Sequence, residues 1–142
     1  MAETMINAEI EIKVPFYDVD SMSITWHGNY AKYLEDARCA LLDKIGYNYD
    51  VMLNSGYAWP LVGLKIKYIS PARFNQKIRV RAMLEEYENC IKIKYIITDA
   101  ETKKTIAKAE TVQMAIDMNT MQSLYFSPQI LLDKVRGYLE KS

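Results

Sequence analysis

The sequence predicts an α+β domain in which an antiparallel sheet packs against one long helix. Residues 30–45 place apolar side chains at helical spacing, and four later segments alternate apolar and polar residues as half-buried strands do. The connections between those later segments are short, which favours antiparallel pairing. One face of such a sheet is apolar and must be covered, and the long helix is the obvious cover.

The length and charge of the chain indicate a single globular domain and argue against a nucleic-acid-binding protein. At 142 residues we expect a single domain over residues 1–142 with a substantial core. Eighteen basic and eighteen acidic residues give zero formal net charge, which is unlike the basic excess of nucleic-acid-binding proteins. No apolar run reaches membrane-spanning length, and the N-terminal MAETMINAEI lacks a signal-peptide pattern. We therefore expect a cytoplasmic protein that binds no nucleic acid and spans no membrane.

Residues suited to metals and cofactors are sparse. The chain has one histidine, and Cys39 and Cys90 lie far apart without the spacing of metal ligands, so we expect reduced structural thiols. The five glycines form no phosphate-binding pattern, and no G-x-S-x-G motif is present. We therefore expect no metal site and no cofactor.

The expected elements follow one another without a linker or repeat. Asn29 is expected to cap the long helix and Gly46 to end it, and Ser127 is expected to cap a terminal helix. Residues 47–59 are expected to form a connecting region with a turn at residues 54–56. The predicted strands are residues 8–17, 61–69, 77–87, 90–98 and 104–118, and the predicted helices are residues 30–45 and the segment from Pro128 onward.

The segment FYDVDSMSITWHGNYAKYLEDAR, residues 16–38, holds the candidate chemistry. Asp18 and Asp20 stand at the end of the first strand, and W-H-G-N-Y leads into the long helix. A helix start has N–H groups without intrahelical acceptors and a partial positive charge. Such an end could polarise a carbonyl oxygen while a nearby carboxylate acts on the carbon.

These motifs resemble the hydroxybenzoyl-CoA thioesterase branch of the hotdog-fold acyl-CoA thioesterases. The matching features are D-x-D, W-H-G-N-Y, the helical E-D-A-R and the later S-P-A-R-F at residues 70–74. The resemblance implies a hotdog fold, with the sheet wrapped around a long central helix. It also implies hydrolysis of an acyl-CoA thioester to a free acid and CoA, with coenzyme A entering as part of the substrate. Ser23 is a departure, because the family usually carries glycine three residues after the second Asp.

The resemblance also assigns roles. Asp20 is the implied catalytic carboxylate, as nucleophile or general base, although an Asp at a strand end can instead bond nearby backbone N–H groups. Asp18 is expected to orient the loop. The backbone N–H of His27 is the implied donor to the thioester oxygen, while its imidazole could orient a water or simply pack beside the helix start. Gly28 is expected to permit a close backbone approach.

Several further residues have both a functional and a structural interpretation. Lys65, Lys67, Arg79 and Arg81 could join Arg73 in holding the phosphates of coenzyme A, or form a solvated strand face. The rival carboxylates Glu35 and Asp36 point away from the buried helix stripe, toward solvent, a subunit interface or Arg38. Tyr47, Tyr49, Tyr57 and Trp59 either line an acyl pocket or pack in the core. The expected substrate-binding residues are Trp26, Gly28, Asn29, Tyr30 and Arg73.

Three other functions of the same fold stay open. They are a non-catalytic acyl-CoA binding module, an acyl-ACP thioesterase, and an acyl-thioester dehydratase with His27 as its sole candidate histidine. One helix cannot cover the whole apolar sheet, and the sheet edges stay open, so we expect a homodimer or a tetramer of dimers. By resemblance, Asp20 of one chain should approach His27 and Gly28 of another.

Overall fold

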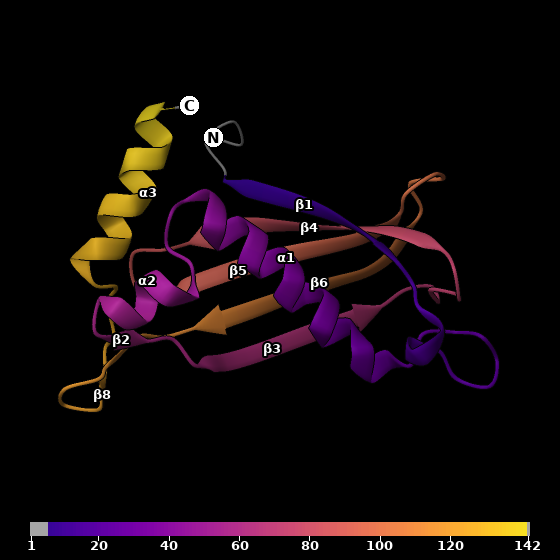
Figure 1. Ribbon diagram of the computed structural model, residues 1–142, viewed down its shortest axis with the longest axis horizontal. Helices are drawn as coiled ribbons and strands as arrows, with labels where there is room; N and C mark the ends of the chain where they lie inside the picture. The colour runs from indigo at the N-terminus through magenta and orange to yellow at the C-terminus, as the bar shows by residue number, and fades with distance from the viewer. Residues whose placement is uncertain (1–5, 142) are drawn as a thin grey trace.

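The computed structural model describes residues 6–141, in which a curved antiparallel sheet is crossed by one long helix (Figure 1). The predicted N-terminal stretch MAETMINAEI lies partly outside this range, at residues 1–5, as does residue 142 of the predicted domain. Within it, the main sheet has the strand order β1-β4-β5-β6-β3. Its strands are β1 (Asn7–Lys13), β3 (Leu61–Tyr68), β4 (Lys77–Glu86), β5 (Ile91–Asp99) and β6 (Thr105–Gln113). The predicted α+β class is confirmed.

The remaining elements frame this sheet. A small second sheet joins β2, β7 and β8. The central helix α1 is preceded by two 3-10 turns, and α3 closes the described chain. The bounds are β2 (Tyr57–Ala58), β7 (Ile116–Asp117), β8 (Gln122–Ser123), η2 (Phe16–Asp18), η3 (His27–Asn29), α1 (Tyr30–Lys44), α2 (Tyr49–Asn54) and α3 (Gln129–Lys141). None of the helices within residues 6–141 is long and apolar enough to cross a membrane.

The core lies between α1 and the face of the sheet that it crosses. Leu34, Ala37 and Leu41 repeat at helical spacing and are almost fully buried. They meet an alternating apolar face on β4 and β5, which includes Val80 and Ile93. Each large side chain buried in this way stabilises the fold by about 1.5–3 kcal/mol. The apolar side chains at helical spacing on α1 and those at alternate positions on the strands therefore pack into one core.

Two strands are shorter than predicted. Strand β1 ends at Lys13, and Phe16–Asp18 turn into η2 instead of extending the strand to residue 17. Pro15 has no N–H to donate to a sheet ladder, which explains the end of β1. The single strand predicted at residues 104–118 is also wrong. It breaks after Gln113, and β7 leaves the main sheet to pair with β2.

The structure corrects the helix boundaries too. The connecting region contains the helix α2, capped by the Asn48 side chain, which accepts a 3.1 Å hydrogen bond from the Val51 N–H. Asn29 does not cap α1, because its backbone is already helical and its side-chain amide donates to the Asp18 carbonyl at 2.9 Å. The Ser127 hydroxyl does not cap α3, since it is buried without a hydrogen-bond partner among the described residues. Gly46 follows α1 with a positive φ of 77°, as predicted for a helix end.

The two edges of the main sheet are β1 and β3. Leu61, Val62, Leu64 and Tyr68 of β3 are all exposed in the single chain. β3 pairs with β6 on one side, and its other side is the edge of the sheet. An apolar open edge of this length is the kind of surface that proteins cover or pair.

Candidate active site

The D-x-D loop and the S-P-A-R-F segment lie side by side, although about fifty residues separate them. Residues 19–25 form a closed loop in which the Asp20 N–H donates to the Ile24 carbonyl at 2.9 Å. The Thr25 N–H donates to Ala72, and the Phe74 N–H donates to the Ser23 carbonyl at 2.9 Å. The resulting bridge between Ile24 and Arg73 places Arg73 beside the loop. The two segments that carry the resemblance thus form one structural unit.

Ser23 keeps the backbone conformation that glycine would favour. Its φ is +62°, in the left-handed region that costs a non-glycine residue roughly 1–2 kcal/mol. Ser23, the departure from the family pattern noted in the sequence, thus takes a backbone conformation that glycine adopts without strain.

Asp18 ties this loop to the start of α1. Its side chain is 2% exposed, and its Oδ2 accepts a 2.7 Å hydrogen bond from the Tyr33 hydroxyl. The Lys32 ammonium lies 2.6 Å from Oδ1. The Asp18 carbonyl also accepts from the Trp26 N–H at 3.0 Å and from the Asn29 amide. Burial, followed by hydrogen bonding to Asp18, raises the pKa of Tyr33 well above its usual range. These contacts give Asp18 a structural role in this chain.

Asp20 lies at the exposed end of the same loop. Its Oδ1 accepts a 2.8 Å hydrogen bond from the Met22 N–H and a longer one, at 3.4 Å, from Ile24. Its Oδ2 accepts no hydrogen bond from residues 6–141, and the residue is exposed. One oxygen therefore holds the turn while the other is available, so the turn interpretation and the catalytic interpretation are compatible.

The helix start has two backbone N–H groups without a backbone acceptor among the described residues, at the positions where the resemblance implies oxyanion donors. Within residues 6–141, neither the His27 N–H nor the Gly28 N–H donates to a backbone acceptor. The exposed His27 ring lies between Trp26 and Tyr68, at ring distances of 5.0 and 6.0 Å. The His27 carbonyl accepts a 3.1 Å hydrogen bond from the Tyr68 hydroxyl. This fixes the helix start at the C-terminal end of β3.

Gly28 accommodates its neighbour Trp26. A Cβ at position 28 would lie only 2.1 Å from the Trp26 indole. The space beside Gly28 is therefore occupied, in this chain, by an aromatic ring that is itself 55% exposed, and the close approach of a substrate to this backbone stays a prediction. An indole held over the helix start could form one wall of a substrate site.

The other predicted binding residues have different environments. Tyr30 is only 3% exposed, and its ring packs 5.1 Å from Tyr68, so its side chain belongs to the core. Burial raises the pKa of its hydroxyl. Among the basic residues considered for phosphate binding, Arg79 pairs with Glu11 across the β1–β4 ladder at 3.7 Å. Arg73 lies beside the loop and is exposed, and its role in phosphate binding stays a prediction.

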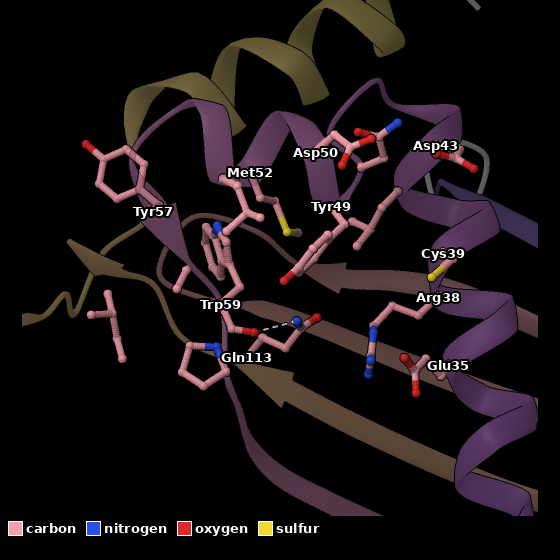
Figure 2. Close-up of a pocket in the computed structure, with 16 residues that line it drawn as sticks. Glu35, Arg38, Cys39, Asp43, Tyr49, Asp50, Met52, Tyr57, Trp59 and Gln113 are labelled. Atoms are coloured by element: carbon pink, nitrogen blue, oxygen red, sulfur yellow. Dashed lines mark hydrogen bonds between the residues drawn. The ribbon is translucent and has the colours of Figure 1, made fainter. Parts of the chain in front are cut away.

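A cavity of about 880 Å³ opens on another flank of α1, where α2, β2 and the end of β6 meet it (Figure 2). We call it the α1–α2 cavity. Tyr49, Tyr57 and Trp59 line it, as one interpretation of the sequence predicted. Tyr47 does not, because it is fully buried and accepts a 3.0 Å hydrogen bond from the Trp59 indole. The other lining residues are Glu35, Arg38, Cys39, Leu42, Asp43, Asn48, Asp50, Met52, Leu53, Ala58, Pro60, Gln113 and Ile116.

The cavity separates the two rival carboxylates of α1. Glu35 lines it, whereas Asp36 is exposed on another face of the helix. Figure 2 shows Glu35 and Arg38 on the same side of α1. Sequence reasoning considered Arg38 only as a partner for these carboxylates and did not consider Gln113 at all. Gln113 is a single amide at the end of an alternating strand, and nothing along the sequence indicates that it faces a cavity until the fold is known.

The two cysteines, Cys39 and Cys90, are free thiols in environments that favour the protonated form. Burial raises the pKa of each thiol above its ordinary value, which disfavours the reactive thiolate. Residues 6–141 also bring together no group of three side chains suited to holding a metal ion.

Sequence comparison identifies the family to which a chain with this fold and this loop belongs. The chain belongs to the thioesterase-like superfamily, whose sequence pattern matches residues 14–132. It is 30% identical to a putative esterase of Aquifex aeolicus over 70% of this chain and 77% of that protein. It is 32% identical to the putative acyl-CoA thioesterase YneP of Bacillus subtilis, over 54% of this chain and 56% of YneP. The chain thus spans about half the length of this and similar curated relatives.

A solved structure agrees with the fold. Slr0204, a 1,4-dihydroxy-2-naphthoyl-CoA thioesterase from Synechocystis, superimposes with a TM-score of 0.79 at 19% identity. The match covers 92% of this chain and 96% of that one. The hotdog fold expected from the resemblance is therefore confirmed.

Proposed function

We propose that this protein is an acyl-CoA thioesterase of the hydroxybenzoyl-CoA thioesterase branch. One observation carries the proposal. The carboxylate of Asp20 is exposed, with only Oδ1 hydrogen-bonded, and it stands in a loop that Asp18 connects to the start of α1. The names of YneP and Slr0204 support the same class of reaction.

The proposed chemistry uses the two features that this loop joins. The thioester carbonyl oxygen accepts hydrogen bonds from the backbone N–H groups of His27 and Gly28, which stabilise the negative charge that develops there. Oδ2 of Asp20 either attacks the carbonyl carbon or removes a proton from an attacking water. The carbon–sulfur bond breaks, the CoA thiolate leaves and takes up a proton, and water supplies the oxygen of the free acid. If Asp20 is the nucleophile, that water hydrolyses an intermediate mixed anhydride.

The alternative activities differ in what they need from His27. A dehydratase needs a histidine positioned with a carboxylate, but no carboxylate of residues 6–141 lies within 4.0 Å of the His27 imidazole. This observation disfavours dehydration within one chain. An acyl-ACP thioesterase would act on the same thioester carbonyl, so the site chemistry is the same for both substrates. A non-catalytic binding module would use the same cavity but would release no product.

A thiol-release assay over a panel of acyl-CoAs tests the proposal. Asp20→Asn should lower kcat at least about a hundredfold with little change in acyl-CoA affinity, because the amide is a poor nucleophile and a poor base. Asp36→Asn, on an exposed face of α1, is the matched control, and Glu35→Gln tests the rival carboxylate of the cavity. Near-normal turnover by Asp20→Asn on every substrate would contradict the assignment. An enoyl product would indicate dehydration, and binding without any product would indicate a module.

We also propose that the complete site forms in a symmetric dimer through β3. Eight residues of strand span about 23 Å, so the His27 end of β3 lies far from Trp59 and Pro60, which precede its other end. A two-fold axis that pairs two β3 edges antiparallel would set the C-terminal end of one β3 beside the N-terminal end of the other. The α1–α2 cavity of one subunit would then adjoin the helix start of its partner.

A further inference from the structure

Gln113, the last residue of β6, has an unusual hydrogen-bonding state. It is 6% exposed, it lines the α1–α2 cavity, and its Nε2 donates to the Trp59 carbonyl at 2.8 Å (Figure 2). A carbonyl can only accept, so this bond fixes which end of the amide is the oxygen. That oxygen, Oε1, is buried and accepts no hydrogen bond from residues 6–141. A buried acceptor that residues 6–141 leave unpaired is uncommon, and its donor is a water or a bound ligand.

Arg38 supplies the complementary group. It is half-buried, and Figure 2 shows its side chain and the Gln113 amide extending into the same hollow from α1 and from β6. No carboxylate of residues 6–141 lies within 4.0 Å of the guanidinium. Gln113 Oε1 therefore lacks a donor on a cavity wall to which Arg38 also belongs, and a hydroxyl is the simplest neutral group that donates to an amide oxygen.

The rest of the cavity argues for a neutral ligand with an apolar body. Leu42, Met52 and Trp59 provide apolar walls. Glu35, Asp43 and Asp50 also line it, and these three carboxylates disfavour an anionic ligand. A carbon chain or ring that carries a hydroxyl fits this combination better than a carboxylate or a phosphate does.

We propose that the α1–α2 cavity holds the acyl group of the substrate, and that Gln113 selects acyl groups carrying a hydroxyl that donates to its Oε1. This inference rests on the proposed thioesterase function and names the substrate class. The amide N–H groups of the pantetheine arm are a second source of the same donor chemistry. We assign the donor to the acyl group because the walls around Gln113 are largely apolar, whereas the pantetheine arm is polar along its length.

The test compares plain acyl-CoAs with their hydroxylated forms, such as octanoyl and benzoyl thioesters with a hydroxyl at each available position. In the wild-type protein, at least one hydroxylated form should exceed its plain partner in kcat/KM by about ten- to a hundredfold, since one buried hydrogen bond separates them. Gln113→Met should bring that ratio close to one, and the ratio is taken within the variant so that a uniform change in kcat/KM cancels. Gln122→Met, on the exposed β8, is the matched control.

Each other outcome overturns the inference. Equal kcat/KM within every pair in the wild-type protein would exclude hydroxyl selection, and this result needs no variant that might misfold. A loss on all substrates with an unchanged ratio of hydroxylated to plain kcat/KM in Gln113→Met would assign the donor to the pantetheine arm. Calorimetric binding of the same pairs to Asp20→Asn tests selectivity without turnover. Absent hydrolysis with retained selectivity would therefore refute the proposed function alone, whereas hydrolysis without selectivity would refute this inference alone.

Discussion

The Tyr33 hydroxyl of α1 donates a 2.7 Å hydrogen bond to Oδ2 of the buried Asp18 carboxylate and so couples the helix to the D-x-D loop. We expect Tyr33→Phe to destabilise the fold by about 1–3 kcal/mol, because a buried carboxylate loses a donor. Urea unfolding measures the change. Lys32→Met is the comparison, because it removes the charged donor to Oδ1 of the same carboxylate and leaves the Tyr33 hydrogen bond in place. Equal stability of Tyr33→Phe and the wild-type protein would mean that Lys32 and the backbone suffice to hold the loop.

Buried tyrosines predict a loss of stability at alkaline pH. Burial is the largest cause of the raised pKa values of Tyr30, Tyr33 and Tyr95. In the unfolded chain a tyrosine ionises near pH 10, so the folded state binds more protons above that pH. The contribution of these residues is fully present below about pH 10 and is lost as the pH rises toward their folded pKa values. Unfolding midpoints measured from neutral to alkaline pH should fall above that point, and less steeply in Tyr33→Phe.

Substitutions of Ser23 test how far the stability and activity of the loop depend on the left-handed backbone conformation at this position. Ser23→Gly should retain activity and change stability by no more than about 1 kcal/mol, because relief of strain and added chain entropy oppose each other. Ser23→Val should destabilise the loop more, since a β-branched residue at positive φ is strongly disfavoured. Thermal unfolding and kcat are the measurements. An active and fully stable Ser23→Val would show that the loop can leave this conformation without consequence for Asp20.

Gly28 predicts a link between the Trp26 indole and the helix start. In Gly28→Ala the new Cβ displaces the indole, which is half exposed and can swing outward. We expect a change in Trp26 fluorescence and a lower kcat/KM, with little loss of stability. A Trp26→Phe background removes the reporter, and the buried Trp59 then serves as the control signal. An unchanged spectrum together with unchanged kinetics would mean that the indole does not shape the site.

The sequence predicted the parts of this protein that short-range patterns encode. The apolar spacing of residues 30–45 matches α1 within one residue, and the alternating segments match β3, β4 and β5 closely. The break after Gln113 was missed because apolar alternation continues through Ile116, while the separate pairing of β7 with β2 is a long-range contact. The helix α2 was missed because it is six residues long and buries only Met52.

The candidate site divides in the same way. Asp20 and His27 belong to one contiguous motif, so the sequence alone was enough to select them as candidates. Gln113 reaches the α1–α2 cavity because β6 pairs with β3 in a register that sets it opposite Leu61. Arg38 meets the same cavity only because α2 and β2 close it. No local pattern carries those relationships.

The last prediction concerns which elements the two subunits contribute. The Asp18 carbonyl accepts from Trp26 and Asn29 of its own chain, so the D-x-D loop and the helix start meet without a partner. The cavity, by contrast, would come from the other subunit in a dimer paired through β3. Mixing Asp20→Asn chains with Ala58→Trp chains, whose cavity is filled, should restore part of the activity, because each mixed dimer regains one intact site.

Mixing Asp20→Asn with Gly28→Val is the matched comparison. We expect no recovery there, since the carboxylate and the N–H donors belong to one chain. Recovery in this second mixture would instead support the arrangement implied by the resemblance, with Asp20 facing the helix start of the partner. Light scattering gives the oligomeric state, and co-purification through an affinity tag carried by one of the two chains establishes that mixed dimers or tetramers form in both experiments. An active monomer, or failure of both verified mixtures, would exclude a site shared across β3, because neither way of dividing its parts between subunits would then account for activity.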